Sequence, residues 1–393
     1  MKTYDWIVVG GGITGAALSY ELRQADFSVL LLEPHLIANS ATNATRYSYG
    51  GIPYWSGTTP LTQQLCTEGL EIQRHLTAEL DVDTQFRYLD LVLTIGLDSD
   101  PQVIAETYSN CAIAPSLVSA SQARELEPLL NPEAIAGALV FKHAHVNAAL
   151  LASAYCTAFQ KCGGEATAAK VEQLLSDRRN VRGVITDRGT YHAANVAICA
   201  GGISRQLLRD SGIRVKQYFT HAELIETNPV DLELRALVMP AENKRLQFET
   251  SASNEDIDAL WDAPDRELAA PSIDAGAIQF ADRTIKIGQL SRILTNPYAP
   301  VNAARSEAEI RAKVGAILPA IASLPGQWHS CLVAFSQDSL PLIGAIPDFE
   351  HIHIFSGFTS PMVYVPTLAR RFAAFAAGES DPIISQLLPQ RFA

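Results

Sequence analysis

Residues 7–33 read IVVGGGITGAALSYELRQADFSVLLLE, and this stretch predicts how the chain begins to fold. A short apolar strand over residues 5–10 is followed by a glycine turn, a helix over about 13–24 and a second apolar strand over 28–32. Two such strands joined by a helix form a β-α-β unit with a parallel strand pair. The stretch therefore predicts an α/β, Rossmann-like domain that binds a nucleotide.

The glycine turn has the spacing Gly10-x-Gly12-x-x-Gly15. The first glycine permits the tight turn, the second lets the backbone approach a pyrophosphate, and the third lets the helix pack closely on the strand. The helix N-terminus offers amide donors and a positive dipole end to phosphates. Glu33 ends the second strand, where a carboxylate accepts hydrogen bonds from both ribose hydroxyls and disfavours NADP. The turn alone does not distinguish an NAD site from a flavin site or from a site that merely holds a nucleotide. It is also compatible with glycines that serve only helix packing.

The composition limits the function classes. The 393 residues suit two domains, consecutive or interleaved, and 48% apolar with 18% charged residues is typical of a soluble globular protein. A net charge of −12 repels phosphate backbones and anionic lipid heads, so nucleic-acid and membrane-surface partners are disfavoured.

The cysteines and the apolar runs indicate a compartment. The six cysteines form no CxxC pair, and no Cys/His cluster has zinc-ligand spacing, so no metal is expected. We therefore expect all six cysteines to be reduced thiols, which is typical of proteins in a reducing compartment. The first apolar strand leaves no room for a signal peptide, and no apolar run is long enough to span a bilayer. We therefore expect a cytoplasmic protein without a transmembrane segment, of unknown oligomeric state.

Hydrophobic periodicity and turn signals predict most of the remaining elements. Helices are expected over residues 61–80, 121–130, 148–161, 304–318 and about 365–377, and strands over 85–95, as a strand–turn–strand over 183–202 and as a hairpin over 275–293.

Three distant stretches add to the glycine turn: NVAICAGG (195–202), SQDSLPLIG (336–344) and FSGFTS (355–360). Together with VVGGGITG (8–15) they resemble the D-amino-acid oxidase, glycine oxidase and sarcosine oxidase superfamily. A nicotinamide dehydrogenase has no reason to carry these C-terminal segments, so the resemblance implies FAD. It also implies an FAD-binding domain interleaved with a mixed-sheet, α+β substrate domain. The FAD-binding domain would take residues 1–82, 139–212 and 330–393, and the substrate domain residues 83–138 and 213–329.

The resemblance assigns FAD binding to residues that lie far apart along the chain. They are Gly10, Gly12, Thr14, Gly15, Glu33, Pro34, Ser40, Thr42, Asn43, Ala44, Thr45, Arg46, Val171, Ala200, Gly201, Gly202, Cys331, Gly357, Phe358, Thr359, Ser360, Pro361 and Met362.

Three segments are most similar to the monomeric sarcosine oxidase branch: NATRYSYGG (43–51), TIKIG (284–288) and SCLVAFSQD (330–338). The first implies that Arg46 is a cation that favours negative charge on the reduced flavin. The alternative interpretation is an ordinary surface arginine on a loop. The second implies that Lys286 activates oxygen. The alternative interpretation is a hairpin lysine that faces water. The third aligns Cys331 with a covalent flavin link, but its neighbours differ, so a core cysteine is favoured.

The sequence departs from these relatives where they bind a substrate carboxylate. The expected cations are replaced by Tyr49, by Pro361 and, at the glycine oxidase position, by Val333. A buried carboxylate without a partner is costly. We therefore expect a substrate other than a simple amino acid held in the usual way, or another residue that supplies the charge.

Aromatic and imidazole side chains complete the expected site. Tyr49, Tyr54, Trp55 and Met362 predict an apolar pocket, although each alone is compatible with ordinary core. His221 and His329 are substrate-side candidates by position only, and the neighbours His143 and His145 lack a third metal ligand.

The resemblance implies an FAD-dependent oxidoreductase that converts a small-molecule amine to an imine by hydride transfer to the flavin, with oxygen as the acceptor. Arg46 and Lys286 are the expected electrostatic contributors to catalysis, with Tyr49 as a further candidate. Two alternatives stay open: a dehydrogenase of an amino or hydroxy acid that uses another electron acceptor, and a protein that holds flavin without turnover.

Overall fold

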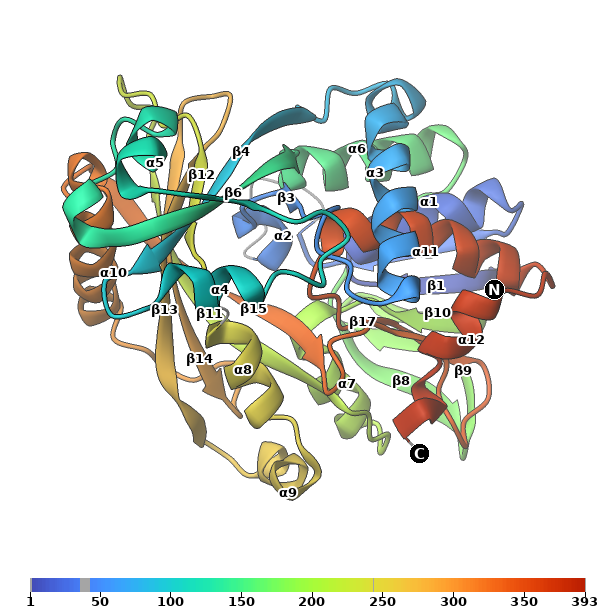
Figure 1. Cartoon of the computed structure of the whole chain (residues 1–393). Helices are drawn as coiled ribbons and strands as arrows, with labels where there is room; N and C mark the ends of the chain where they lie inside the picture. Colours follow the sequence, from blue (N-terminus) through green and yellow to red (C-terminus); the bar gives the residue numbers. More distant parts are fainter. Residues whose placement is uncertain (1, 36–42, 243, 393) are drawn as a thin grey trace.

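The computed structural model describes residues 2–35, 43–242 and 244–392, and it contains two β-sheets with helices packed around them (Figure 1). The predicted Ser40 and Thr42 lie outside the described residues. Two sheets, one largely parallel and one mixed, confirm the predicted fold class. No helix of the described segments is long and apolar enough to cross a membrane.

The first sheet has eight strands in the order β16-β17-β10-β1-β2-β7, and β9 and β8 continue it from β10. Parallel pairing joins β17, β10, β1, β2 and β7, and the β1–β2 pair among them is the one that the opening β-α-β unit predicts. Its strands are β1 (Thr3–Val9), β2 (Val29–Glu33), β7 (Glu165–Ala168), β8 (Val171–Asp177), β9 (Asn180–Thr186), β10 (Gly189–Ile198), β16 (Leu342–Ala345) and β17 (Ile352–Ser356).

The second sheet has nine strands in the order β15-β11-β14-β13-β12-β4-β6-β3, and β5 pairs with β6. It is mixed because β12 runs parallel to β4, whereas its other pairs are antiparallel. Its strands are β3 (Gly51–Ile52), β4 (Arg87–Gly96), β5 (Ser116–Val118), β6 (Ile135–His145), β11 (Gln217–Thr227), β12 (Leu237–Pro240), β13 (Glu267–Gln279), β14 (Ile285–Leu294) and β15 (Gly326–Ser336).

Helices pack against both sheets. Helix α1 contacts α6 and α11 beside the first sheet, and α10 packs on β13 and β14 of the second (Figure 1). The α-helices are α1 (Ile13–Gln24), α2 (Ala44–Tyr47), α3 (Pro60–Leu80), α4 (Pro101–Glu106), α5 (Ala120–Leu126), α6 (Ala148–Lys161), α7 (Ser204–Asp210), α8 (Lys244–Ser251), α9 (Glu255–Asp258), α10 (Ala303–Ile317), α11 (Pro361–Ala376) and α12 (Pro382–Leu387).

Prolines account for two differences from the predicted helices. The helix expected over 121–130 ends at Leu126, because Glu127 precedes a proline and adopts an extended conformation. The helix expected from about residue 365 begins at Pro361, since a proline fits the first helical turn.

The expected domain boundaries stay a prediction. Strands β6 and β15 cross two of these boundaries, after residues 138 and 329, and both strands lie in the second sheet. Strand β3 also joins this sheet, although its residues fall in the segment expected to bind FAD.

Candidate functional site

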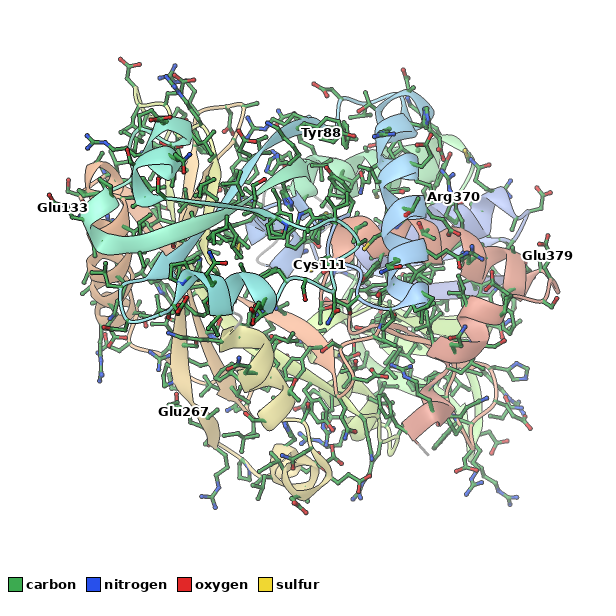
Figure 2. The ribbon with its side chains drawn as sticks, in the orientation of Figure 1. Tyr88, Cys111, Glu133, Glu267, Arg370 and Glu379 are labelled. Carbon is green, nitrogen blue, oxygen red and sulfur yellow. The ribbon has the colours of Figure 1, made fainter. Side chains whose placement is uncertain are left out.

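A cavity of about 1500 Å³ is lined by residues of both sheets. One part is lined by the glycine turn after β1, by the end of β2 and by the loop before α11, and the other by strands and loops of the second sheet. In the view of Figure 2, Cys111, which lines this cavity, projects near the centre, whereas the exposed Glu133, Glu267 and Glu379 project at the edge. The cavity therefore connects a nucleotide-type turn with side chains of the second sheet.

The glycine turn has the backbone geometry that its spacing predicts. Gly10 has a φ of +106°, and a Cβ placed on it would lie 2.6 Å from the Cys199 carbonyl oxygen. A side chain at Gly15 would overlap the Gly10 carbonyl, so this glycine lets α1 start directly against the turn. At Gly12 the nearest atom to a built Cβ is the Thr45 hydroxyl at 3.2 Å.

The first turn of α1 retains donors that point to an anion. The amides of Gly12 and Thr14 have no acceptor among the described residues, and both residues line the cavity. The amide of Ile13 donates to the Thr45 hydroxyl at 3.0 Å and is thus already satisfied. Unpaired amides at a helix N-terminus bind phosphate oxygens well. The turn therefore fits the pyrophosphate of a dinucleotide.

Glu33 has the position that a ribose-binding acid requires. Its Oε2 accepts a hydrogen bond from the Gly11 amide at 2.7 Å, and its Oε1 accepts one from the His35 amide at 3.1 Å. These bonds fix the carboxylate at the end of β2, where it lines the cavity. The remaining lone pairs can accept hydrogen bonds from two ribose hydroxyls.

Most of the predicted cofactor residues surround this cavity. Those that line it are Gly10, Gly12, Thr14, Glu33, Pro34, Asn43, Ala44, Thr45, Val171, Ala200, Gly201, Gly202, Cys331, Gly357, Phe358, Thr359, Ser360, Pro361 and Met362. Gly15 lies beneath the turn, and Arg46 borders a neighbouring pocket of about 110 Å³ instead. The set fits FAD, and these assignments remain proposals.

Arg46 is bound to the second sheet. Its two Nη atoms donate to the two carboxylate oxygens of Glu226 on β11, at 2.7 and 2.8 Å. This hydrogen-bonded pair raises the pKa of the guanidinium, so Arg46 stays charged. The Glu226 carboxylate offsets the positive charge of Arg46, so the two side chains together form a pair with no net charge.

Lys286 is buried and fastens the loop that follows Arg46. Its Nζ donates to the Arg46 carbonyl at 2.8 Å and to the Ser48 carbonyl at 2.9 Å. The side chain does not line the cavity, and burial lowers the pKa of its ammonium to about 8. The alternative of a hairpin lysine that faces water is thus wrong, because the carbonyl partners hold the side chain inside, and the role in oxygen activation stays a prediction.

Cys331 and Tyr49 both line the cavity, but the thiol and the phenol are held in their neutral, unreactive forms. Burial raises the pKa of the Cys331 thiol to about 12, which disfavours the nucleophilic thiolate. The Tyr49 hydroxyl donates to the Gly288 carbonyl, and burial raises the pKa of this phenol well above its ordinary value. Tyr49 therefore closes the cavity wall and is a poor proton donor or acceptor for a substrate.

The predicted aromatic pocket is present in part. Tyr49, Trp55 and Met362 line the cavity, whereas Tyr54 packs behind it. Trp55 stacks on a phenylalanine with ring centroids 3.7 Å apart, and its indole donates to His143 Nδ1 at 3.0 Å. These contacts fix an apolar wall.

The histidines do not form a metal site in the described part of the chain. Burial lowers the pKa of both His143 and His145 to about 3, so both are neutral. His221 lines the cavity, whereas His329 stacks on Tyr47 outside it.

Four charged residues that β13, α8 and the segment after β12 contribute to the cavity wall were missed by sequence reasoning: Glu242, Arg245, Glu249 and Asp274. Arg245 and Glu249 lie on α8, and Arg245 Nε donates to Glu249 Oε1 at 2.8 Å. The spacing of four residues between Arg245 and Glu249 is the one signal for this pair in the sequence. Asp274 lies in β13 and has no comparable signal.

Comparison with known proteins identifies what this fold and cavity resemble. A family model described as FAD dependent oxidoreductase matches residues 5–375. The 4-methylaminobutanoate oxidase (formaldehyde-forming) of Paenarthrobacter nicotinovorans is 23% identical over 382 residues, which cover 93% of this chain and 43% of that protein. The chain thus spans less than half of this relative's length.

Two solved structures share the whole fold. Glycine oxidase from Geobacillus kaustophilus superimposes with a TM-score of 0.78 at 18% identity, covering 100% of this chain and 99% of that one. L-Proline dehydrogenase from P. horikoshii superimposes with a TM-score of 0.76 at 16% identity, covering 100% and 98%. At these identities the likeness concerns the fold.

Proposed function

The chain belongs to the family of FAD-dependent oxidoreductases, and on this basis we propose that it oxidises the carbon–nitrogen bond of a small-molecule amine. The observation that carries the proposal is the single cavity of about 1500 Å³ that joins the glycine turn to the apolar wall of the second sheet. A dinucleotide held at the turn then leaves its other end beside a substrate pocket.

The residues around the turn are proposed to hold FAD. The amides of Gly12 and Thr14 bind the pyrophosphate, the Glu33 carboxylate binds the ribose, and Val171 lies at the adenine end. FAD, when bound, supplies the acceptor for the hydrogen and two electrons that leave the substrate, and the product is an imine.

The chain's own contribution is proposed to be orientation and exclusion of water. Trp55 and Met362 form apolar wall, and His143 beside them is neutral. An apolar wall disfavours a charged ammonium, so the reacting amine is held neutral with its lone pair free. No protein base is then needed, which agrees with the hydrogen-bonded Tyr49 phenol.

Oxygen is the proposed acceptor of the electrons, and a non-oxygen acceptor is the second candidate. One observation favours the second candidate: the Lys286 ammonium donates to two backbone carbonyls and does not line the cavity. A dehydrogenase that passes electrons to another carrier has no need of a cation exposed to oxygen.

An anaerobic titration tests the proposal. The purified yellow protein is mixed with a panel of primary, secondary and tertiary amines, with matched alcohols as the control. We expect amines to bleach the flavin absorbance, and air to restore it with formation of peroxide. Bleaching by the alcohols alone, or by nothing in the panel, would contradict amine oxidation. Bleaching that air does not reverse would favour the second candidate.

A further inference from the structure

The substrate end of the cavity has an excess of negative charge. Among the described lining residues contributed by the second sheet and its associated segments, the carboxylates are Glu242, Glu249 and Asp274, and the one cation is Arg245. This pattern is the opposite of a pocket built for a carboxylate, which requires uncompensated positive charge.

The positive charge of Arg245 is already matched. Its Nε donates to Glu249 Oε1 at 2.8 Å, and the same oxygen accepts the Thr220 hydroxyl at 2.6 Å. Glu249 is buried, so this ion pair has little solvent screening. A carboxylate that approached Arg245 would also meet the negative charge of Glu249.

Asp274 is the carboxylate without a hydrogen-bond donor. Only 9% of its surface is exposed, it lines the cavity, and no described residue donates a hydrogen bond to it. By contrast, Glu242 accepts the Ser99 hydroxyl at 3.0 Å and the Gly96 amide at 3.4 Å. The register of β13 against β14 shifts between Ile273 and Gly276, and irregularities of this kind redirect a side chain.

A buried carboxylate that lacks donors is costly unless a cation or a proton joins it. Burial raises the pKa of Asp274, the nearby Arg245 and Lys244 lower it, and the Glu249 carboxylate adds to the rise. A ligand cation placed in the cavity would supply both the missing charge and the missing donors.

We propose that the substrate carries a second cationic group besides the amine that is oxidised, and that the Asp274 carboxylate binds this group. The substrate class is a diamine, in which one nitrogen reacts as a neutral amine and the distal nitrogen is an ammonium. This inference rests on the proposed amine oxidation, and it names the substrate class for that site.

Three secondary amines of similar length test the inference on the FAD-loaded protein: N-methyl-1,4-diaminobutane, N-methylpentylamine and 4-methylaminobutanoate. They end in an ammonium, a methyl group and a carboxylate. The dissociation constants by calorimetry and kcat/KM by anaerobic bleaching are measured for the wild type and Asp274→Asn. We expect the wild type to favour the ammonium-ended amine over the methyl-ended one by about 10- to 100-fold in both quantities. Asp274→Asn should abolish this preference, so that the ammonium-ended and the methyl-ended amine are bound and oxidised about equally.

Asp231→Asn is the matched control, because Asp231 is a fully exposed acid paired with Arg283 and lies outside the cavity wall. It should retain the preference. Melting curves establish that both variants fold. A preference that survives in Asp274→Asn, or a wild type that favours 4-methylaminobutanoate, overturns the inference. If ammonium binding depends on Asp274 but no amine is oxidised, the inference stands and the proposed function fails. If amines are oxidised without any ammonium preference, the function stands and the inference fails.

Discussion

At the scale of single residues, Cys331 matches a motif for covalent flavin attachment but lies in surroundings that disfavour that chemistry. It lies on β15 opposite Ala222 of β11, among apolar side chains. Covalent attachment requires a thiolate, but burial raises the pKa of this thiol to about 12. Cys331 also lines the cavity, so the role in core packing that the sequence favours stays a prediction.

We therefore predict that the FAD is not covalently bound. Acid precipitation of the yellow protein should leave the flavin in the supernatant, and Cys331→Ser should retain the FAD content of the wild type. A yellow pellet that becomes colourless in Cys331→Ser would instead show a thioether link. Cys162→Ser is the control, since Cys162 is exposed and lies outside the cavity wall.

A second prediction at the residue scale concerns Lys286 and pH. Its pKa of about 8 means that the ammonium loses its proton as pH rises through 8, well below the ordinary value for lysine. If this charge assists oxygen, the rate of reoxidation by oxygen should fall by about tenfold per pH unit above 8, and the protonated form should dominate below it. Stopped-flow mixing of the reduced protein with oxygen at pH 6 to 10 measures this rate.

Lys286→Met should slow reoxidation at pH 7 and remove its pH dependence. Lys142→Met is the matched control, because Lys142 is an exposed strand lysine paired with Asp90. Two results would contradict this prediction: a wild-type reoxidation rate that is flat across this pH range, or a Lys286→Met variant that reoxidises as fast as the wild type. Either result would mean that Lys286 only holds the loop after Arg46 in place, and would favour another electron acceptor.

At the scale of elements, the β-α-β unit was predictable from the sequence because its signals are local. The strand, turn and helix of residues 3–24 use apolar runs and glycine spacing within one short stretch. Strand β11 was not predicted, because it is buried on both faces and its sequence does not alternate. Its buried polar residues find partners far away in the sequence: Thr220 donates to Glu249, and Glu223 accepts from Arg292.

The same reasoning explains why the charged wall of the cavity was missed. Helix α8 has few apolar residues, and its position depends on contacts with β13 and β11. Asp274 faces the cavity in a part of β13 where the strand register shifts, which no local pattern reveals. The cofactor end could therefore be predicted from short motifs, whereas the substrate end needed the tertiary structure.

The link between α2 and β11 yields a prediction about stability. The Arg46–Glu226 pair is mostly buried, with 25% and 15% of the side chains exposed, and it joins a loop of the cofactor side to the second sheet. Removing either partner leaves a poorly solvated charge. Arg46→Met and Glu226→Gln should each lower the free energy of unfolding by about 1–3 kcal/mol.

The double variant should lose less than the sum of the single variants, because it leaves neither charge unpaired. Urea unfolding of the FAD-loaded proteins measures this coupling. The exposed Arg305–Glu309 pair on α10 is the control and should show little coupling. Strictly additive losses for Arg46 and Glu226 would mean that the pair does not fasten the loop.

At the scale of the whole molecule, the two sheets meet around one large cavity. Residues from β1, β2 and α11 line it together with residues from β11, β13 and β15. A cofactor in this position contacts both sheets, so its binding energy is added to the contacts between them. The unpaired amides at the turn and the charged residues of the second sheet and α8 place polar groups in an otherwise largely apolar interior.

Removing FAD should therefore lower the melting temperature of the whole chain. A ligand that binds only the folded state at 100 times its Kd contributes about 2.7 kcal/mol to stability. We expect apoprotein to melt several degrees lower than the FAD-loaded protein, and added FAD to restore the melting temperature in a concentration-dependent way. Hydrogen exchange should rise in β1 and in β11 alike, because the cavity borders both strands. Equal melting temperatures, or faster exchange confined to the glycine turn, would mean that FAD contributes to local order without stabilising the contact between the sheets.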